Sequence, residues 1–206
     1  MAVDKLIVAE CERLLEHVRK LCPGLLPAKP IRAGTVAGTI QLSSDRASAL
    51  FAPAAGLAAG IDPFATSPAP SSVKWQEGDR ELLVFPAKVT ARFGTGVIAV
   101  SIPVSCDQTG DAVVYVSFVV GDPKQPAGLI AAADARPRGP AAIVDGWGSA
   151  LIAFAWHVVL EVATHVAGAA GRDVDGSRLV PIGLAASADG LFIVPMARHT
   201  FDRVRG

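Results

Sequence analysis

Two adjoining stretches of regularly alternating residues constrain the fold of this chain more than any other feature. Residues 97–106 place apolar side chains at every second position from Ile98 onward, and residues 112–120 (AVVYVSFVV) follow after a short glycine-containing turn. Alternation with a period of two predicts β-strands, and a strand that is apolar on both faces predicts a central strand or one covered on both sides. Together with the alternating run at 88–93, these segments predict a three-strand antiparallel meander.

Two further segments have the patterns of helices. Residues 3–21 carry apolar side chains at helical spacing and charged side chains on the opposite face, which predicts an amphipathic helix. A second and much more apolar helix is expected to begin at Asp145 or Ser149 and to end near Gly168. The first helix needs an apolar surface on one side only, whereas the second is expected to pack on most of its circumference.

Shorter elements complete the expected fold. Residues 34–42 alternate like a strand, and Ser44 is the expected N-cap of a short helix that ends near Phe51. Asp189 and Gly190 lie between two apolar runs, a strong signal for a hairpin. The order of elements predicts the α+β class: a mainly antiparallel sheet, made of the meander plus a C-terminal hairpin, packed against one long helix and an N-terminal amphipathic helix.

The length of 206 residues is that of a single domain. A loop rich in proline and serine separates its two parts, and a basic tail ends it. The expected division of residues 1–206 is an N-terminal helix and strand (1–61), the loop (62–73), the main α+β part (74–197) and the tail (198–206).

The composition is apolar for a chain of this size. Hydrophobic residues make up 51% and charged residues 18%, against about 25% charged residues in typical soluble domains. Apolar surface beyond what one core can hide is commonly covered by a second subunit, so a homo-oligomer, with the dimer favoured, is expected. The formal net charge of zero gives no support to a nucleic-acid partner, which leaves a small molecule or a protein.

The cysteines and the N-terminal sequence indicate in which cellular compartment the chain is expected. On one helix, Cys11 and Cys22 would lie about 16 Å apart, too far for a disulfide, and Cys106 leaves an odd number. Unpaired cysteines suit a reducing compartment, and charges from Asp4 onward interrupt any signal-like apolar run. The chain is therefore predicted to be cytoplasmic.

The apolar segment 149–170 is close to the length that spans a bilayer, but it contains three polar side chains. These are His157, Glu161 and His165. A charged residue near the bilayer centre costs about 2.5–3.5 kcal/mol even on lenient scales. We therefore expect no membrane partner and a buried helix instead.

The same three residues form the best candidate for chemistry. Spaced four apart, His157, Glu161 and His165 lie along one stripe of the helix. Histidine is the usual general base near neutral pH and a carboxylate orients it, so they are the expected catalytic residues of a hydrolase or isomerase. Two of them could also hold a metal ion, although the outer pair is about 12 Å apart. The simpler explanation of the stripe is the solvated face of a mostly buried helix, with ion pairs between Glu161 and the histidines. A polar pocket or a subunit contact is a further alternative.

A second candidate site precedes the long helix. Arg136 and Arg138 lie near a glycine-rich helix start that contains Trp147, an arrangement that suits an anion. The dinucleotide fingerprint is excluded because its third small residue would fall on Leu151. Trp147 and Trp156 could line a ligand pocket, whereas core packing is the structural alternative.

Three functions follow from these patterns. The favoured one is a homo-oligomeric module that binds a small molecule or a protein without catalysis. The alternatives are an enzyme that uses the His/Glu stripe and a structural subunit of a larger assembly. The patterns name no cofactor, and the metal, if any, stays unknown.

Overall fold

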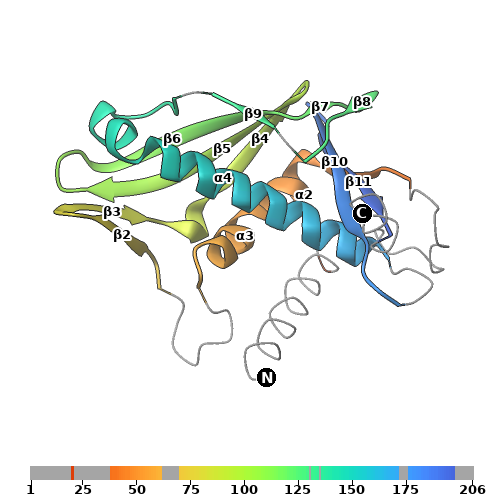
Figure 1. Cartoon of the computed structure of the whole chain (residues 1–206), viewed down its shortest axis with the longest axis horizontal. Coiled ribbons are helices and arrows are strands. Elements are labelled where there is room, and N and C mark those ends of the chain that lie inside the picture. The colour runs from red at the N-terminus through yellow and green to blue at the C-terminus, as the bar shows by residue number, and fades with distance from the viewer. Residues whose placement is uncertain are drawn as a thin grey trace, which may run out of the picture.

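The computed structural model describes residue 20 and residues 38–61, 70–129, 131–134, 136–171 and 176–197. Within these ranges the predicted α+β class is confirmed: antiparallel sheets pack against one long helix (Figure 1). The predicted amphipathic helix at 3–21 lies outside the described residues except for Lys20, which is helical. Residues 62–69 of the expected loop and the tail from 198 lie outside them too, and the division of the chain stays a prediction.

The larger sheet contains the predicted meander, which is confirmed. β4, β5 and β6 pair antiparallel in sequence order, and β5 and β6 are ten residues long. The sheet order is β2-β3-β5-β6-β9, with β4 beside β3 on the same edge of β5. Its strands are β2 (Val73–Glu77), β3 (Arg80–Val84), β4 (Thr90–Gly94), β5 (Val97–Cys106), β6 (Gly110–Val119) and β9 (Ala132–Ala133). A 3-10 turn, η1 (Pro86–Lys88), joins β3 to β4.

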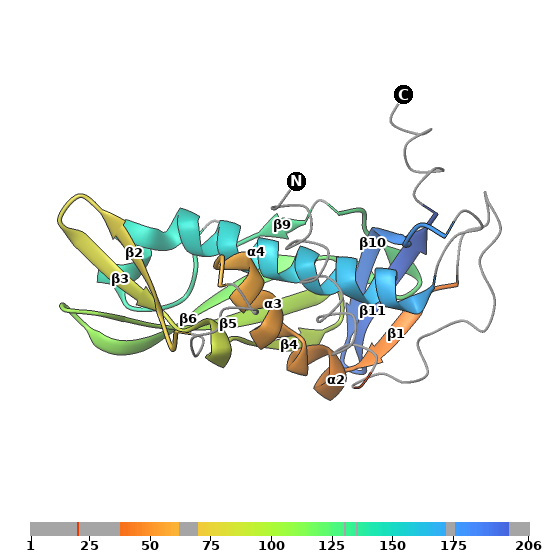
Figure 2. The ribbon, with the colours of Figure 1, turned by 90° about the horizontal axis from the view of Figure 1, so that it is seen from below.

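Within the described residues, one face of this sheet packs against helices and the other does not. Val100 and Val116 are fully buried on the inner face, which α3 (Phe51–Ala58) and α4 (Ala141–Ala170) cover (Figure 2). On the outer face of β6, Tyr115 is 45% and Val119 58% exposed. The sequence predicted that this strand is central or covered on both faces, and the first of these is what the structure has, because β6 lies between β5 and β9. Its outer face is not covered by the described residues.

Helix α4 begins earlier than the sequence predicted. It starts at Ala141, directly after Pro140 at the N-cap, and runs to Ala170 rather than to Gly168. Proline suits a helix start because its missing N–H has no helical partner there. By length and composition alone α4 could cross a membrane, but 56% of its most apolar window is buried inside the protein, as in a core helix.

The smaller sheet confirms the predicted hairpin. β10 (Val180–Ser187) and β11 (Gly190–Met196) pair antiparallel, and β1 (Ile40–Ser43) joins the other edge of β11. This sheet and the β2–β3 hairpin lie at opposite ends of the molecule (Figure 1). The two-stranded β7 (Gly121–Asp122) and β8 (Gln125–Pro126) lead to a bridge between Ala127 and Leu184, which ties the two sheets together.

The short helix after β1 differs from its prediction in two ways. Ser43 takes the N-cap position of α2 (Ser44–Ala49), and the Ser44 hydroxyl instead donates a hydrogen bond of 3.0 Å to the carbonyl of Ala188. The helical path then continues as α3, because Pro53 falls in the first turn, where no helical N–H partner is lost.

Candidate functional site

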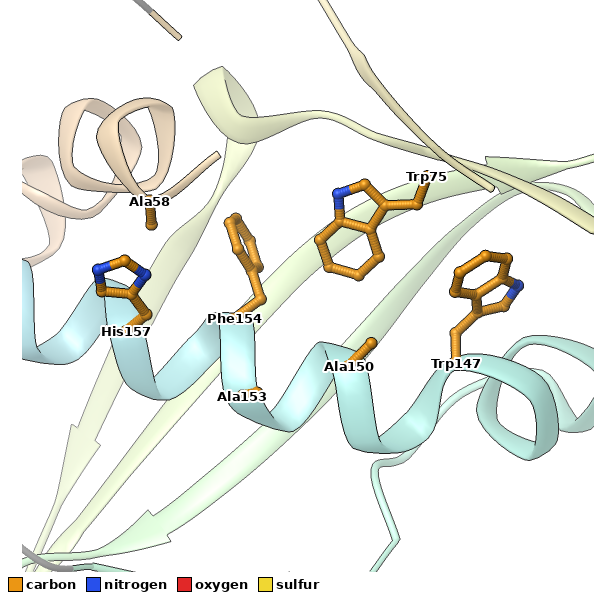
Figure 3. A pocket seen from close by; sticks show the side chains of 7 residues that line it. All are labelled: Ala58, Trp75, Trp147, Ala150, Ala153, Phe154 and His157. Carbon is orange, nitrogen blue, oxygen red and sulfur yellow. The ribbon is translucent and has the colours of Figure 1, made fainter. Parts of the chain in front are cut away.

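An apolar groove of about 430 Å³ follows the first half of α4 (Figure 3). It lies between this helix, the end of α3 and the strand β2. Its walls and floor are Ala58, Trp75, Trp147, Ala150, Ala153, Phe154 and His157.

The sequence builds this groove by simple periodicities. Trp147, Phe154 and His157 lie seven and three residues apart, which places them on one face of α4. Between them, the small side chains of two exposed alanines leave open space above the surface of α4. Trp75 reaches the groove from β2, where it is paired with the buried Leu82 and so faces the helix.

Aromatic contacts fix the walls. The ring of Trp75 meets Phe154 edge-to-face with 5.4 Å between centroids and lies 6.3 Å from the ring of Trp147. Such pairs are worth about 0.5–1.5 kcal/mol beyond the burial of their area. Trp147 and Phe154 are only 8% and 7% exposed, so the groove presents their edges while most of each ring is held in the core.

The predicted His/Glu stripe is a connected unit that begins at the groove. The side chain of His157 is 54% exposed at the end of the groove, and its Nε2 lies 3.2 Å from Oε1 of Glu161. Glu161 is 27% exposed and reaches the second histidine with its other oxygen, 3.3 Å from Nδ1 of His165. The structure thus brings all three predicted residues together around one carboxylate.

His165 is buried, with 7% exposure, unlike the other two. Its Nδ1 lies 2.7 Å from the backbone oxygen of Glu161. Since a carbonyl only accepts, Nδ1 carries the proton of the neutral ring. Burial lowers the pKa of His165 below its ordinary value, as does the charge of Arg178, while the backbone bond and the charge of Glu161 oppose the shift.

Acid should therefore destabilise the protein through His165. The unfolded chain takes up a proton on this histidine below about pH 6.5, whereas the folded state resists it. The contribution of His165 to the free energy of unfolding is therefore complete above that pH. It decreases by up to about 1.4 kcal/mol per pH unit as the pH falls toward the lowered pKa of the folded state. Urea unfolding between pH 7.5 and 5 should show this slope in the wild type and a smaller slope in His165→Gln. His157→Gln, the matched control, leaves His165 in place and should keep the slope.

The candidate metal site gains no support from geometry. Among the described residues there is no group of three or more His, Cys, Asp or Glu side chains that could hold an ion. Each oxygen of Glu161 contacts one histidine. A metal ion at this place would need further ligands, and the described ranges place none close enough.

The residues of the predicted anion site lie differently from the prediction, because α4 starts at Ala141. Gly146 and Gly148 lie beyond the first four helical residues, so their amides bond within the helix. Gly146 makes room for Arg80, whose Nη1 would lie 2.8 Å from an added Cβ. Arg136 forms an exposed ion pair with Asp145, and Arg138 bridges Tyr115 at the edge of β6.

The two tryptophans predicted to line one pocket lie apart. Trp147 lines the groove, whereas Trp156 packs its ring 5.1 Å from the buried Phe118 and is absent from the groove lining. Sequence reasoning missed Trp75 and Phe154. The available signals were the spacing of seven between Trp147 and Phe154 and the Gly78 turn that makes β2 and β3 a hairpin.

Comparison with known proteins does not assign the chain to a class. No family model, no curated protein and no solved structure matches it.

Proposed function

We propose that this chain is a homo-oligomeric binding module without catalysis, and that its groove on α4 receives the apolar face of a helical segment from a partner protein. The observation that carries this proposal is the groove itself: two tryptophans and a phenylalanine around a floor of exposed alanines. Aromatic side chains dominate binding energy at protein interfaces. A low alanine floor lets another backbone approach α4 closely.

The shape of the groove favours a protein segment over a small molecule. Its volume is within the range of ligand sites, but such sites enclose most of the ligand. Here Ala150, Ala153 and His157 are exposed, so one long side stands open to solvent. An open apolar groove along a helix is the geometry that accepts an amphipathic helix with anchors spaced three and four residues apart.

His157 supplies a polar contact at one end of the groove. Its ring is half exposed and is oriented by Glu161 at 3.2 Å. One polar group at the end of an apolar groove would fix the direction in which a helix lies, because the wrong direction leaves that group without a partner.

A charge on the floor of the groove should abolish binding. We expect Ala153→Glu to weaken binding of a model amphipathic Leu/Lys helical peptide at least about tenfold, because the carboxylate would be desolvated against the apolar face. Binding is measured by tryptophan fluorescence in a Trp156→Phe background, so that the two groove tryptophans report. Ala142→Glu, also an exposed alanine of α4 but outside the groove lining, is the control and should bind like the parent.

Two results would contradict this proposal. The peptide could fail to bind the parent at any accessible concentration, or it could bind Ala153→Glu as tightly as Ala142→Glu. Tight binding of the aromatic dye anilinonaphthalene sulfonate, without the peptide, would indicate a small apolar ligand instead.

An enzyme is the second candidate, and one observation favours it. Nε2 of His157 faces Glu161, which is how a general base is oriented toward a substrate. Saturable hydrolysis of an aryl ester that is lost in His157→Ala but kept in Ala142→Glu would favour this function over the binding module.

A further inference from the structure

The exposed apolar side chains of the described ranges gather on one surface. All four large hydrophobic residues that are exposed there belong to the six-stranded sheet: Leu83, Val113, Tyr115 and Val119. Their strand partners put them on the outer face, opposite α4, since Pro103, Ser101 and Val97 of β5 alternate with the fully buried Ile98 and Ile102. We refer to the outward residues of β3, β4, β5 and β6 as the outer face.

The outer face has a relief that fits a copy of itself. Along β6 the large side chains of Val113, Tyr115 and Val119 form a ridge. Beside it, β5 turns the small side chains of Ala99 and Ser101 outward, which makes a furrow. A two-fold axis lets the ridge of each copy lie in the furrow of the other, which is the condition for a closed symmetric pair.

The rim of the outer face also suits self-association. Arg92 and Thr90 lie exposed on the β4 edge, and Asp111 lies exposed at the start of β6. An apolar centre that contains Tyr, surrounded by a polar rim, is the usual composition of an interface, and Arg is also enriched there; Tyr115 is the single tyrosine of the chain. With a net charge of zero, two copies do not repel each other as a whole.

The size of this side of the sheet approaches that of a standard dimer interface. Ten-residue strands are about 33 Å long. Because β3 and β4 lie end to end on one edge of β5, the sheet reaches a width of four strands, about 19 Å, with β2 at one end of β5 and β9 at the other. The projected area of roughly 600 Å², increased by the relief of the side chains, approaches the ~800 Å² per partner of a standard interface. We infer that two copies of this chain dimerise face to face through the outer face, independently of the groove on α4.

Sedimentation velocity of the full chain tests this dimer. The wild type should have twice the monomer mass of 21.2 kDa at 10 μM. Val119→Glu places a carboxylate at the most exposed of the apolar positions and should raise the dimer dissociation constant at least 100-fold, leaving a folded monomer. Ala153→Glu makes the same kind of change in the groove and should stay dimeric. The dimer rests on the homo-oligomeric part of the proposed function, and it can fail while binding of a helix in the groove is retained, or the reverse.

A second measurement tests the dimer in case Val119→Glu folds poorly. Ser117 lies half-buried between Tyr115 and Val119, so a short bismaleimide, which spans the ~10 Å between packed sheets, should cross-link Ser117→Cys into a dimer. The control is Thr164→Cys, which is exposed on α4 and keeps the same native cysteines. It should not be cross-linked into a dimer. A monomeric wild type at 50 μM, a dimer unchanged by Val119→Glu, or equal cross-linking of the two cysteine variants would overturn the inference.

Discussion

Gly190→Ala should destabilise the protein by at least about 3 kcal/mol, a larger effect than most single substitutions produce. Gly190 opens β11 after the hairpin turn and has a φ of 139°, a conformation that residues with a side chain rarely adopt. An added Cβ would lie 1.9 Å from the backbone oxygen of Leu42. No side-chain rotation relieves a clash with backbone, so the two strands must separate.

The loss of structure should extend beyond Gly190, because the β10–β11 turn also binds the first residues of α2. Gly190 pairs with Ser43, the amide of Ser44 donates to the carbonyl of Asp189 at 3.0 Å, and the Ser44 hydroxyl donates to Ala188. Pushing β1 from β11 breaks these bonds together. The buried Leu42 and Ile193 of the same sheet would lose packing as well.

Thermal unfolding measures this effect. For a chain of this size, 3 kcal/mol corresponds to a fall in Tm of roughly 6–12 °C. Gly60→Ala is the matched control: Gly60 also has a positive φ, 72°, but no atom lies within 4 Å of its added Cβ. The free energy of unfolding of Gly60→Ala should fall by only about 1–2 kcal/mol, the conformational cost of placing alanine at a positive φ. Equal losses in the two variants would show that the contact with Leu42 is unimportant.

The sheet was predictable where local patterns are strict. Alternation over 97–106 and the Asp189-Gly190 pair predicted strands and a hairpin correctly, because period two and turn chemistry act within a few residues. The start of α4 was placed too late because Asp145 and Ser149 look like helix caps. Pro140 ends the preceding loop first, so both residues lie inside the helix.

The groove was not predictable because it is made by contacts between distant segments. Trp75 meets Phe154 only because β2 pairs with β3 and turns its inner face toward α4. Nothing in the local sequence of either residue specifies the other. The stripe of His157, Glu161 and His165 was predictable as a stripe, but the burial of His165 depends on how α4 is rotated against its surroundings.

Strand β6 connects the composition with the structure. Its two apolar faces predicted a strand that is central or covered on both sides; β6 is central, and within the described residues only one of its faces is covered. The other face holds exposed apolar side chains in a chain whose hydrophobic content is high for its size. The proposed dimer would reconcile both facts, since the second cover would come from another copy.

Phe154→Ala should cost about 3 kcal/mol of stability, the lower end for a buried phenylalanine because water can enter from the groove. Phe154 is 7% exposed, and its ring is the edge-to-face partner of Trp75. Its loss removes the nearer of the two aromatic contacts that Trp75 of the β2–β3 hairpin makes with α4. The indole of Trp75 should become wetter, which shifts its fluorescence to the red.

Phe154→Leu separates the ring contact from simple burial. Leucine keeps most of the apolar volume but cannot meet the indole edge-to-face, so it should lose about 1 kcal/mol. Hydrogen exchange should show faster exchange of the β2–β3 amides in Phe154→Ala, while the paired amides of β5 and β6 stay protected. If exchange accelerated equally in all four strands, Phe154 would stabilise the whole sheet and the hairpin would not depend on this contact. If the hairpin alone responded, the wall of the groove that Trp75 forms would be a separable unit, able to move when a partner binds.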